Sequence, residues 1–272
     1  MIGVFDSGLG GLSVAAKIME AYPKEQIVYF ADNAHVPYGE RPLDEIRGFA
    51  LDITAHLITK GAKTVVMACN MSSAVALEAS QNRFPDVPIL GVIEPGAKAA
   101  IGVAGEAPIG VLATSGTVKS GAYEKSIHKL DSQKKVIQQA CPEFVPLVES
   151  GRADSEEAEA AARDYVAPLI GEGCRTIILG CTHYPFLRRA IESAAGRDII
   201  IVDPAVETTQ TLGKILVEQG MAAYRLDAPH VFSASGDTAG FAALGSIFLG
   251  RTIDKVEKIT IAHAVETAVK IE

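Results

Sequence analysis

Short runs of apolar, often β-branched residues recur along the chain and alternate with longer segments of helical periodicity. Seven runs predict strands, at residues 2–5, 27–30, 64–68, 88–93, 109–113, 176–180 and 198–202. Because these runs are apolar at nearly every position, they are typical of parallel strands buried on both faces of a sheet. Helices are predicted between them, at residues 12–22, 43–61 and 154–173. The pattern indicates an α/β protein with parallel sheets.

Three of the predicted strands have counterparts, in the same order, later in the chain. IGVFDSG at residue 2 is similar to IGVLATSG at residue 109, and GAKTVVMACNMSS at residue 61 is similar to GCRTIILGCTHYP at residue 173. PILGVIEPG at residue 88 is similar to DIIIVDPAV at residue 198. Because the spacings agree within a few residues, we expect two pseudo-symmetric α/β domains that face each other across a cleft. Repeated units without a site between them are the alternative.

The chain continues beyond the last repeated strand with fewer elements than a third unit would need. Two helices are predicted, at 207–220 and 237–250, with a strand at 230–235 between them. We expect these elements to return to the first domain. The predicted domains are residues 1–95 with 207–272, and residues 96–206. One predicted helix, at 154–173, opens with Asp154 and Glu157 spaced as in a capping box.

Composition and charge indicate which kind of molecule the protein binds. Apolar residues make up 48% of the chain and charged residues 21%, which argues against a largely disordered protein. The formal net charge is −8 and no cluster of Lys or Arg occurs, so we expect neither nucleic acid nor a membrane surface as partner. The N-terminus has no signal-like pattern, and no apolar run approaches the ~20 residues of a membrane span. We expect a cytoplasmic protein with a small-molecule substrate, and a homodimer stays open.

Two of the four cysteines occupy corresponding positions in the repeat. Cys69, Cys141, Cys174 and Cys181 form neither a CxxC pair nor a zinc-binding spacing, so no metal is expected. Most free cysteines are buried and inert. Cys69 and Cys181, however, follow equivalent predicted strands, and ligands bind beyond the carboxyl ends of parallel strands.

The chemistry expected of such a pair is proton transfer. Ser72 or Ser73 is expected to cap a helix after Cys69, and Pro185 suits the first turn of a helix after Cys181. A helix N-terminus lowers the pKa of a nearby thiol from its ordinary value of about 8.5. Hydrolases need one cysteine with a base, and redox enzymes usually carry two close in sequence. Two equivalent thiols suit a reaction that removes a proton from one face of a carbon and returns one to the other, so racemisation fits best.

Polar residues beyond the other strands indicate an amino-acid substrate. Asp6 and Ser7 lie in FDSGLGG, whose glycines let backbone amides approach a carboxylate, although an ordinary helix cap is the alternative. The same loop lacks the third glycine of a dinucleotide-binding fingerprint. An exposed Tyr38 hydroxyl, beside Gly39, could donate to a carboxylate. Further candidates are Thr114 and Thr117, which otherwise form a turn, and Asp32, Glu149 and His183, which could orient the thiols.

The sequence resembles the glutamate racemase family, cofactor-independent enzymes that supply D-glutamate for bacterial peptidoglycan. The matching segments are FDSGLGG, PYG, ACN, GVLATSGTVKSGAY, CPEFVPLVESG, LGCTHYP, DPAVET and FSASGD with FLG. They cover nearly the whole chain, and the combination of ACN with GCTHYP is specific. The resemblance implies glutamate racemisation in a cleft between two α/β domains, without metal or cofactor.

The resemblance also implies roles for individual residues. Cys69 and Cys181 would be the two acid–base residues, acting on the D- and the L-enantiomer respectively. Substrate-contacting positions of the family fall on Asp6, Ser7, Tyr38, Gly39, Asn70, Thr182 and His183, with Thr114 and Thr117 in the matching threonine loop. Groups that assist proton transfer or position the ammonium group correspond to Asp6, Asp32, Glu149 and His183.

One position departs from the family pattern. The family usually has CNT at the first thiol, whereas this chain has Cys69-Asn70-Met71 followed by Ser72. The backbone amide of Met71 would survive this change, and Ser72 could replace the missing hydroxyl, so both are candidate substrate-binding residues. The alternatives to a glutamate racemase are an aspartate or broad-specificity amino-acid racemase and a non-catalytic amino-acid-binding protein.

Overall fold

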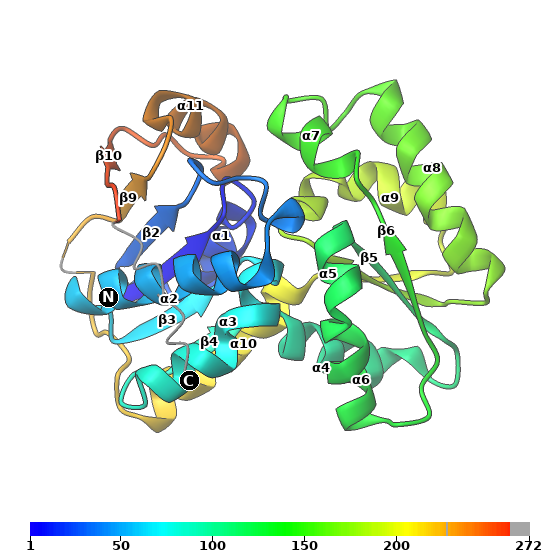
Figure 1. Ribbon diagram of the computed structural model, residues 1–272, viewed down its shortest axis with the longest axis horizontal. Helices are drawn as coiled ribbons and strands as arrows, with labels where there is room; N and C mark the ends of the chain where they lie inside the picture. The colour runs from blue at the N-terminus through cyan, green and yellow to red at the C-terminus, as the bar shows by residue number, and fades with distance from the viewer. Residues whose placement is uncertain (227, 262–272) are drawn as a thin grey trace, which may run out of the picture.

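The computed structural model describes residues 1–226 and 228–261 (Figure 1). In this part of the chain, ten strands form two separate sheets in which every pair of neighbours is parallel. Helices pack around both sheets, and the two sheets lie in the two halves of the molecule (Figure 1). The predicted fold class, two parallel-sheet α/β domains, is confirmed.

The first sheet has six strands in the order β10-β9-β2-β1-β3-β4. Their bounds are β1 (Ile2–Asp6), β2 (Ile27–Ala31), β3 (Thr64–Met67), β4 (Ile89–Gly91), β9 (Val231–Ala234) and β10 (Val256–Lys258). The strand predicted at 230–235 is therefore β9, which pairs with β2. The three-residue strand β10 at the sheet edge was not predicted, because its Glu257 and Lys258 interrupt the apolar pattern.

The second sheet has four strands in the order β6-β5-β7-β8. Their bounds are β5 (Ile109–Ala113), β6 (Val136–Ala140), β7 (Thr176–Gly180) and β8 (Ile200–Val202). This order repeats β2-β1-β3-β4 of the first sheet, strand for strand, so the sequence repeat is a repeat of topology. The prediction missed β6, a half-buried edge strand whose Gln138 and Gln139 break the apolar run.

Apolar layers cover both faces of each sheet. Along β1, Ile2 and Val4 belong to one buried cluster and Phe5 to another. Along β5, Val111 and Leu112 likewise point to opposite sides. Because alternate side chains of a strand point to opposite faces, burial on both sides requires an unbroken apolar run. This is the physical origin of the pattern seen in the sequence.

The five helices predicted by range are present as α1, α2, α8, α10 and α11, and the described residues form six further α-helices. The α-helices are α1 (Leu12–Ala21), α2 (Leu43–Thr59), α3 (Asn70–Arg83), α4 (Ile93–Ala104), α5 (Ser115–Ser120), α6 (Ala122–Leu130), α7 (Phe144–Glu149), α8 (Glu156–Gly171), α9 (Arg188–Ala195), α10 (Pro204–Glu218) and α11 (Thr238–Leu249), with 3-10 helices η1 (Tyr38–Glu40) and η2 (Tyr184–Leu187). The capping box at Asp154 is wrong. Ser155 is the N-cap of α8, and its hydroxyl accepts from the amide of Ala158.

Two helices lie where the chain passes between the halves. The limits predicted at 95/96 and 206/207 fall inside α4 and α10. These helices pack against each other, α10 also packs on α1, and α4 also packs on β7. The exact domain limits stay a prediction.

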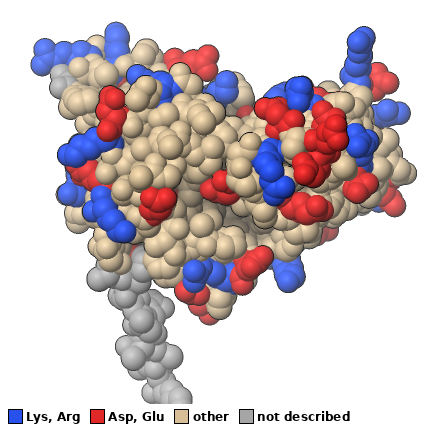
Figure 2. Space-filling model, turned by 90° about the horizontal axis from the view of Figure 1, so that it is seen from above, with Lys and Arg blue, Asp and Glu red and all other residues tan. Residues whose placement is uncertain are grey.

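The surface carries both signs of charge. On the face seen in Figure 2, Lys and Arg are interspersed with Asp and Glu around a centre of mainly uncharged side chains. None of the helices in the described ranges combines the length and the apolar character that crossing a bilayer requires.

A buried ion pair fastens the segment after α10 to the first sheet. The carboxylate of Glu25, 3% exposed, lies 2.7 Å from Lys63 Nζ and accepts from the amide of Ala223 at 2.7 Å. Lys63 also donates to the carbonyl of Met221. We expect Glu25→Ala to lower the free energy of unfolding by about 2–3 kcal/mol, because it leaves a partly buried ammonium group unpaired.

Urea unfolding monitored by circular dichroism measures this loss. Glu172→Ala is the control, since it removes the exposed ion pair with Lys135 and should leave the unfolding midpoint almost unchanged. Equal effects of the two substitutions would contradict the role of Glu25.

Candidate active site

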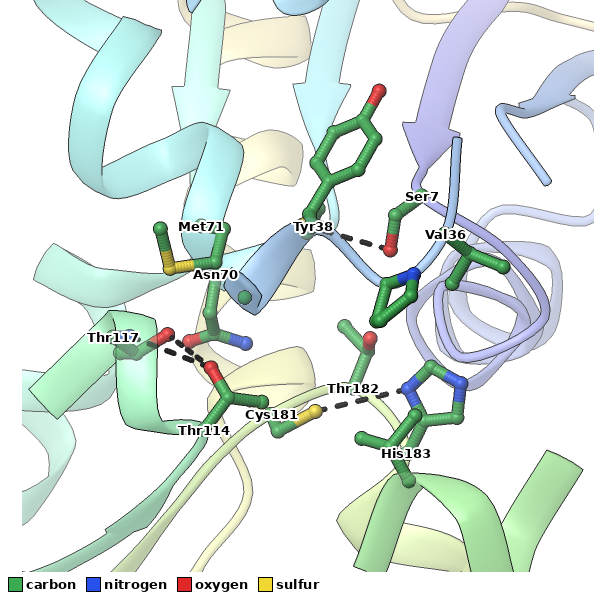
Figure 3. Close-up of a pocket in the computed structure, with 14 residues that line it drawn as sticks. Ser7, Val36, Tyr38, Asn70, Met71, Thr114, Thr117, Cys181, Thr182 and His183 are labelled. Carbon is green, nitrogen blue, oxygen red and sulfur yellow. Dashed lines mark hydrogen bonds between the residues drawn. The ribbon is translucent and has the colours of Figure 1, made fainter. Parts of the chain in front are cut away.

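A pocket with about 390 Å³ of empty space opens where the carboxyl ends of the two sheets meet (Figure 3). Its lining from the first half consists of Ser7, Val36, Pro37, Tyr38, Gly39, Cys69, Asn70 and Met71. Its lining from the second half consists of Thr114, Thr117, Val145, Cys181, Thr182 and His183. Most of the predicted site residues are thus brought together. The predicted residues outside the lining are Asp6, Asp32, Ser72 and Glu149.

The two equivalent thiols reach this pocket from the two sheets. Cys69 follows β3 and is 6% exposed, while Cys181 follows β7 and is 8% exposed. The remaining cysteines, Cys141 and Cys174, are buried elsewhere, and all four are free thiols. Within residues 1–226 and 228–261, no three His, Cys, Asp or Glu side chains form a metal-binding group.

The helix starts beside the thiols differ from the prediction. Cys69 is itself the N-cap of α3, and the serines lie inside the helix. The Ser73 hydroxyl donates to the carbonyl of Met67 and accepts from the amide of Val92. Ser72 or Ser73 as the cap is therefore wrong. Pro185 does lie in the first turn of a helix, the short η2, which leads into α9.

The prediction of a lowered thiol pKa is wrong for Cys69. Burial, together with the negative charge of Asp6, raises the pKa of this thiol to about 12, and the backbone amide of Ser72 offsets only part of the rise. The thiol lies 4.0 Å from Ser7 Oγ, to which it donates. Loss of water thus outweighs the favourable helix end, and Cys69 keeps its proton at neutral pH.

The second thiol has a cationic neighbour. Cys181 Sγ lies 3.7 Å from His183 Nδ1, and His183 Nε2 lies 2.6 Å from Glu149 Oε1. Burial alone would lower the pKa of His183, but its bonds to Cys181 and Glu149 and their negative charges raise this pKa well above its ordinary value. A protonated imidazole places a positive charge beside the Cys181 sulfur. The two equivalent cysteines therefore have opposite electrostatic surroundings.

Asp6 stands behind the pocket wall and joins the two halves. It is buried, accepts from the amide of Gly8 at 3.0 Å and accepts from Thr182 Oγ1 at 3.2 Å. Burial raises the pKa of Asp6, while the charge of His183 and these hydrogen bonds act against the rise. Asp6 consequently holds Thr182 in position from across the domain boundary.

The glycine-rich loop permits close packing against the second thiol's loop. A Cβ on Gly10 would collide with Thr182 Oγ1 and His183 Nδ1. The neighbouring Ser13 hydroxyl lies 3.1 Å from the carbonyl of Thr182, to which it donates. The glycine at position 10 is thus required by the approach of the two halves.

The pocket wall formed by Tyr38 and Gly39 also differs from the prediction. Tyr38 is 2% exposed, and its hydroxyl donates to Asp32 Oδ2 at 2.6 Å, so the prediction of an exposed hydroxyl is wrong. Tyr38 does line the pocket, and its contact with a substrate stays a prediction. Gly39 instead approaches the second half. A Cβ on Gly116 would lie 2.6 Å from the carbonyl oxygen of Gly39 and 3.0 Å from Met71 Sδ.

Hydroxyl and amide groups line the side of the pocket near α5. Thr114 caps α5 by accepting from the amide of Thr117, and the two hydroxyl oxygens are 3.0 Å apart (Figure 3). They are therefore both turn formers and pocket residues. Asn70 is oriented by Tyr123, whose hydroxyl donates to Asn70 Oδ1 at 2.8 Å.

Met71, which stands where the family usually has a threonine, changes the chemistry of the pocket lining. Met71 is buried and lines the pocket, so a thioether stands where the resemblance implies a hydroxyl. Ser72 is fully buried and lies outside the lining. Ser72 does not supply the missing pocket hydroxyl.

Three apolar lining residues were missed by the sequence analysis. Pro37 lies in PYG and Val145 in CPEFVPLVESG, two of the segments that match the family, and Val36 directly precedes PYG. Apolar side chains carry no chemical signal in a sequence, so only their neighbourhood could have indicated them.

Two similar α/β domains that each bring one cysteine to a shared pocket define a class of protein. The chain belongs to the Asp/Glu/Hydantoin racemase family, whose family model matches residues 2–212. Within that family it is similar to the glutamate racemase of Desulforudis audaxviator, with 41% identity over 96% of this chain and 97% of the relative.

Solved structures of glutamate racemases share the fold. An isoform from Bacillus anthracis has a TM-score of 0.92 and 39% identity, covering 96% of this chain and 97% of that one. The enzyme from Francisella tularensis, solved in complex with D-glutamate, has a TM-score of 0.90 and 30% identity, covering 97% and 98%.

Alkylation should report the raised pKa of Cys69. In the ligand-free protein, we expect the rate of Cys69 modification by iodoacetamide to rise continuously from pH 7 to pH 10, because only the thiolate reacts. Peptide mass spectrometry measures the rate. Urea-unfolded protein is the control and should level off near the ordinary thiol pKa of about 8.5. A plateau below pH 9 in the folded protein would contradict the assignment.

Glu149→Gln should lower the pKa of His183, because it removes a negative charge 2.6 Å from the imidazole. Since the folded pKa lies above the unfolded value of about 6.5, the stabilisation by protonated His183 is fully present below pH 6.5. It is lost as the pH rises through the folded pKa. The stability difference between wild type and Glu149→Gln should therefore shrink with increasing pH.

Imidazole chemical shifts in NMR spectra give the titration, and urea unfolding at several pH values gives the stability difference. His230, which lies outside the pocket lining, is an internal control. A His183 titration that is identical in wild type and variant would refute the coupling to Glu149.

Proposed function

We propose that this protein interconverts L- and D-glutamate by proton transfer between Cys69 and Cys181. The observation that carries the proposal is a shared pocket with two equivalent thiols in opposite electrostatic surroundings. The family membership and the similarity to glutamate racemases along nearly the whole chain support the substrate. The binding of D-glutamate by the Francisella tularensis enzyme supports it further.

In this proposal, the protein without substrate already has the protonation states that the reaction of L-glutamate requires. The Cys181 thiolate, stabilised by protonated His183, removes the α-proton, so that the Cα–H bond breaks and an S–H bond forms. The electron pair left on Cα is delocalised into the carboxylate. The Cys69 thiol then donates its proton to the opposite face, which forms D-glutamate and leaves a Cys69 thiolate ready for the reverse reaction.

The surroundings of the thiols lower the barrier. An α-proton of an amino acid is a weak acid, so the carbanion requires fixed donors in a site from which water is excluded. The two thiols are buried, and polar groups surround them. We assign substrate binding to Ser7, Gly39, Asn70, Thr114, Thr117, Thr182 and the backbone amide of Met71. Asp6 and Glu149 act from behind the wall, through Thr182 and His183 respectively.

The biological role follows from the product. We infer that the enzyme supplies D-glutamate for peptidoglycan and acts in the cytoplasm, as its resemblance to the family implies. The homodimer stays a prediction.

A combined optical and isotopic assay tests the proposal. Wild-type protein should change the circular dichroism of L-glutamate, and in heavy water it should place deuterium at Cα. Cys69→Ser and Cys181→Ser should each lose at least about a thousandfold of the racemisation rate, because each removes one acid–base group. Cys174→Ser, which alters a buried thiol outside the pocket, should keep full activity.

The same assay separates the alternatives. Faster turnover of L-aspartate than of L-glutamate would indicate an aspartate racemase. A non-catalytic binding protein would show neither optical change nor deuterium incorporation, and full activity in both pocket variants would refute the two-thiol mechanism.

A further inference from the structure

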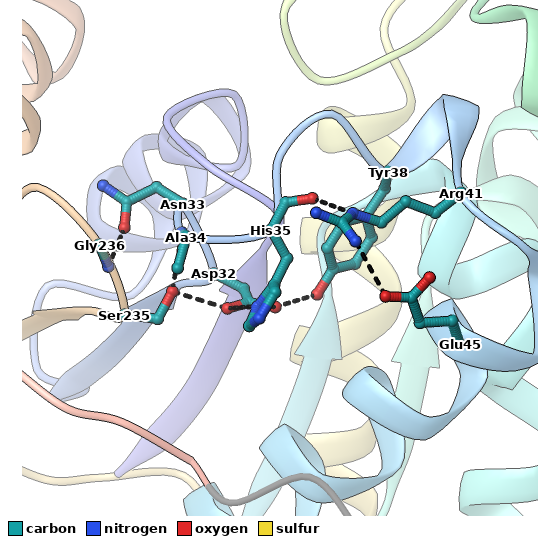
Figure 4. A network of polar contacts seen from close by, with 9 residues as sticks. All are labelled: Asp32, Asn33, Ala34, His35, Tyr38, Arg41, Glu45, Ser235 and Gly236. Carbon is teal, nitrogen blue, oxygen red and sulfur yellow. Dashed lines mark hydrogen bonds and ion pairs between the residues drawn. The ribbon is translucent and has the colours of Figure 1, made fainter. Parts of the chain in front are cut away.

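Asp32 is the centre of a polar network behind the pocket wall (Figure 4). Its carboxylate is 1% exposed and accepts from Tyr38 OH and Ser235 Oγ, both at 2.6 Å. His35 Nδ1 lies 2.8 Å from the same carboxylate. Because Asp32 lies outside the pocket lining, its carboxylate fixes its neighbours instead of exchanging protons with a substrate.

The network holds the segment that carries one wall of the pocket. Residues 36–39 line the pocket, and the residues just before them are tied to the turn between β9 and α11. The amide of Ala34 donates to Ser235 Oγ at 3.0 Å, and the amide of Gly236 donates to Asn33 Oδ1 at 2.6 Å. Asn33 Nδ2 in turn donates to the carbonyl of Asp237 at 2.9 Å.

The parallel pairing of β9 with β2 places Ser235 at this point. Ala31 pairs with Ala234, so the next residues, Asp32 and Ser235, leave the sheet side by side. In the second sheet, β6 is the counterpart of β2 and lies at the edge. The link between Ser235 and Asp32 therefore depends on the returning segment of the chain.

We propose that Ser235 is a positioning residue for substrate binding. Its hydroxyl donates to Asp32 and accepts from Ala34, and through these two contacts it fixes Tyr38 and Gly39 against the pocket. The inference rests on the proposed racemase function. In this inference, the turn after β9 influences the affinity for substrate, and the two thiols carry out the proton transfer.

Kinetics of the Ser235→Ala variant test this proposal. We expect the KM for L-glutamate to rise about five- to tenfold, because a hydrogen bond to a charged group that holds the wall is lost. The kcat should change less than about twofold, since Cys181 and His183 lie on other loops. Ser235→Thr keeps the hydroxyl and should restore the KM.

Ser246→Ala is the matched control. Ser246 lies in α11 of the same segment, and its hydroxyl also accepts from an amide, that of Ile253, and donates to a carbonyl, that of Ala242. It has no link to the pocket wall among the described contacts, so its loss should lower the melting temperature but leave KM unchanged. A KM within twofold of wild type in Ser235→Ala, or an equal rise in Ser246→Ala, would overturn the proposal.

Two further measurements make the test independent of folding and of substrate identity. Tyr38→Phe removes the hydrogen bond from Tyr38 to Asp32, the carboxylate that Ser235 also contacts. Because both substitutions break the same link, the double variant should raise KM by less than the product of the two single effects. Amide hydrogen exchange of residues 33–41 should speed up in Ser235→Ala but stay unchanged in Ser246→Ala. If wild type fails to racemise glutamate, the proposed function fails, and the exchange result still decides whether Ser235 holds the wall.

Discussion

The close approach of the two halves of the molecule is the constraint on which the site depends. Proton transfer through two thiols requires both to face one small substrate, so the loops after the strands must meet with little intervening bulk. Gly10 packs against Thr182 and His183, and Gly116 packs against Gly39. A Cβ at either position would come too close to atoms of the other half, so the contact would have to shift. The hydroxyl of Thr182 donates to Asp6 across the same boundary, and this hydrogen bond fixes how the two loops lie against each other.

A symmetric backbone supports an asymmetric pair of thiols. The strand order β2-β1-β3-β4 recurs as β6-β5-β7-β8, so Cys69 and Cys181 leave equivalent strands. Their surroundings differ because a buried carboxylate lies near the first thiol and a buried imidazole near the second. The repeat thus supplies the geometry of opposed groups. The side chains around it supply the difference between acid and base.

The returning segment of the chain breaks the symmetry in a second way. β9 extends only the first sheet beyond β2, and it brings Ser235 to Asp32 behind the wall that contains Tyr38 and Gly39. This wall thus combines a local hydrogen bond, from Tyr38 to Asp32, with one from Ser235, which lies 203 residues from Asp32 along the chain. One half of the pocket is therefore supported by its own domain and by the chain's last described elements.

The sequence by itself determined the parallel α/β class, the repeat and the placement of both thiols. Strands buried on both faces must be apolar throughout, and equivalent strands must end at equivalent edges. Edge strands such as β6 escaped prediction because half-exposed positions accept Gln. Tertiary structure alone decided that Cys69 keeps its proton, that the Tyr38 hydroxyl turns to Asp32, and that Ser72 lies off the pocket. Burial and the directions of side chains arise from contacts between distant segments, which local sequence patterns do not encode.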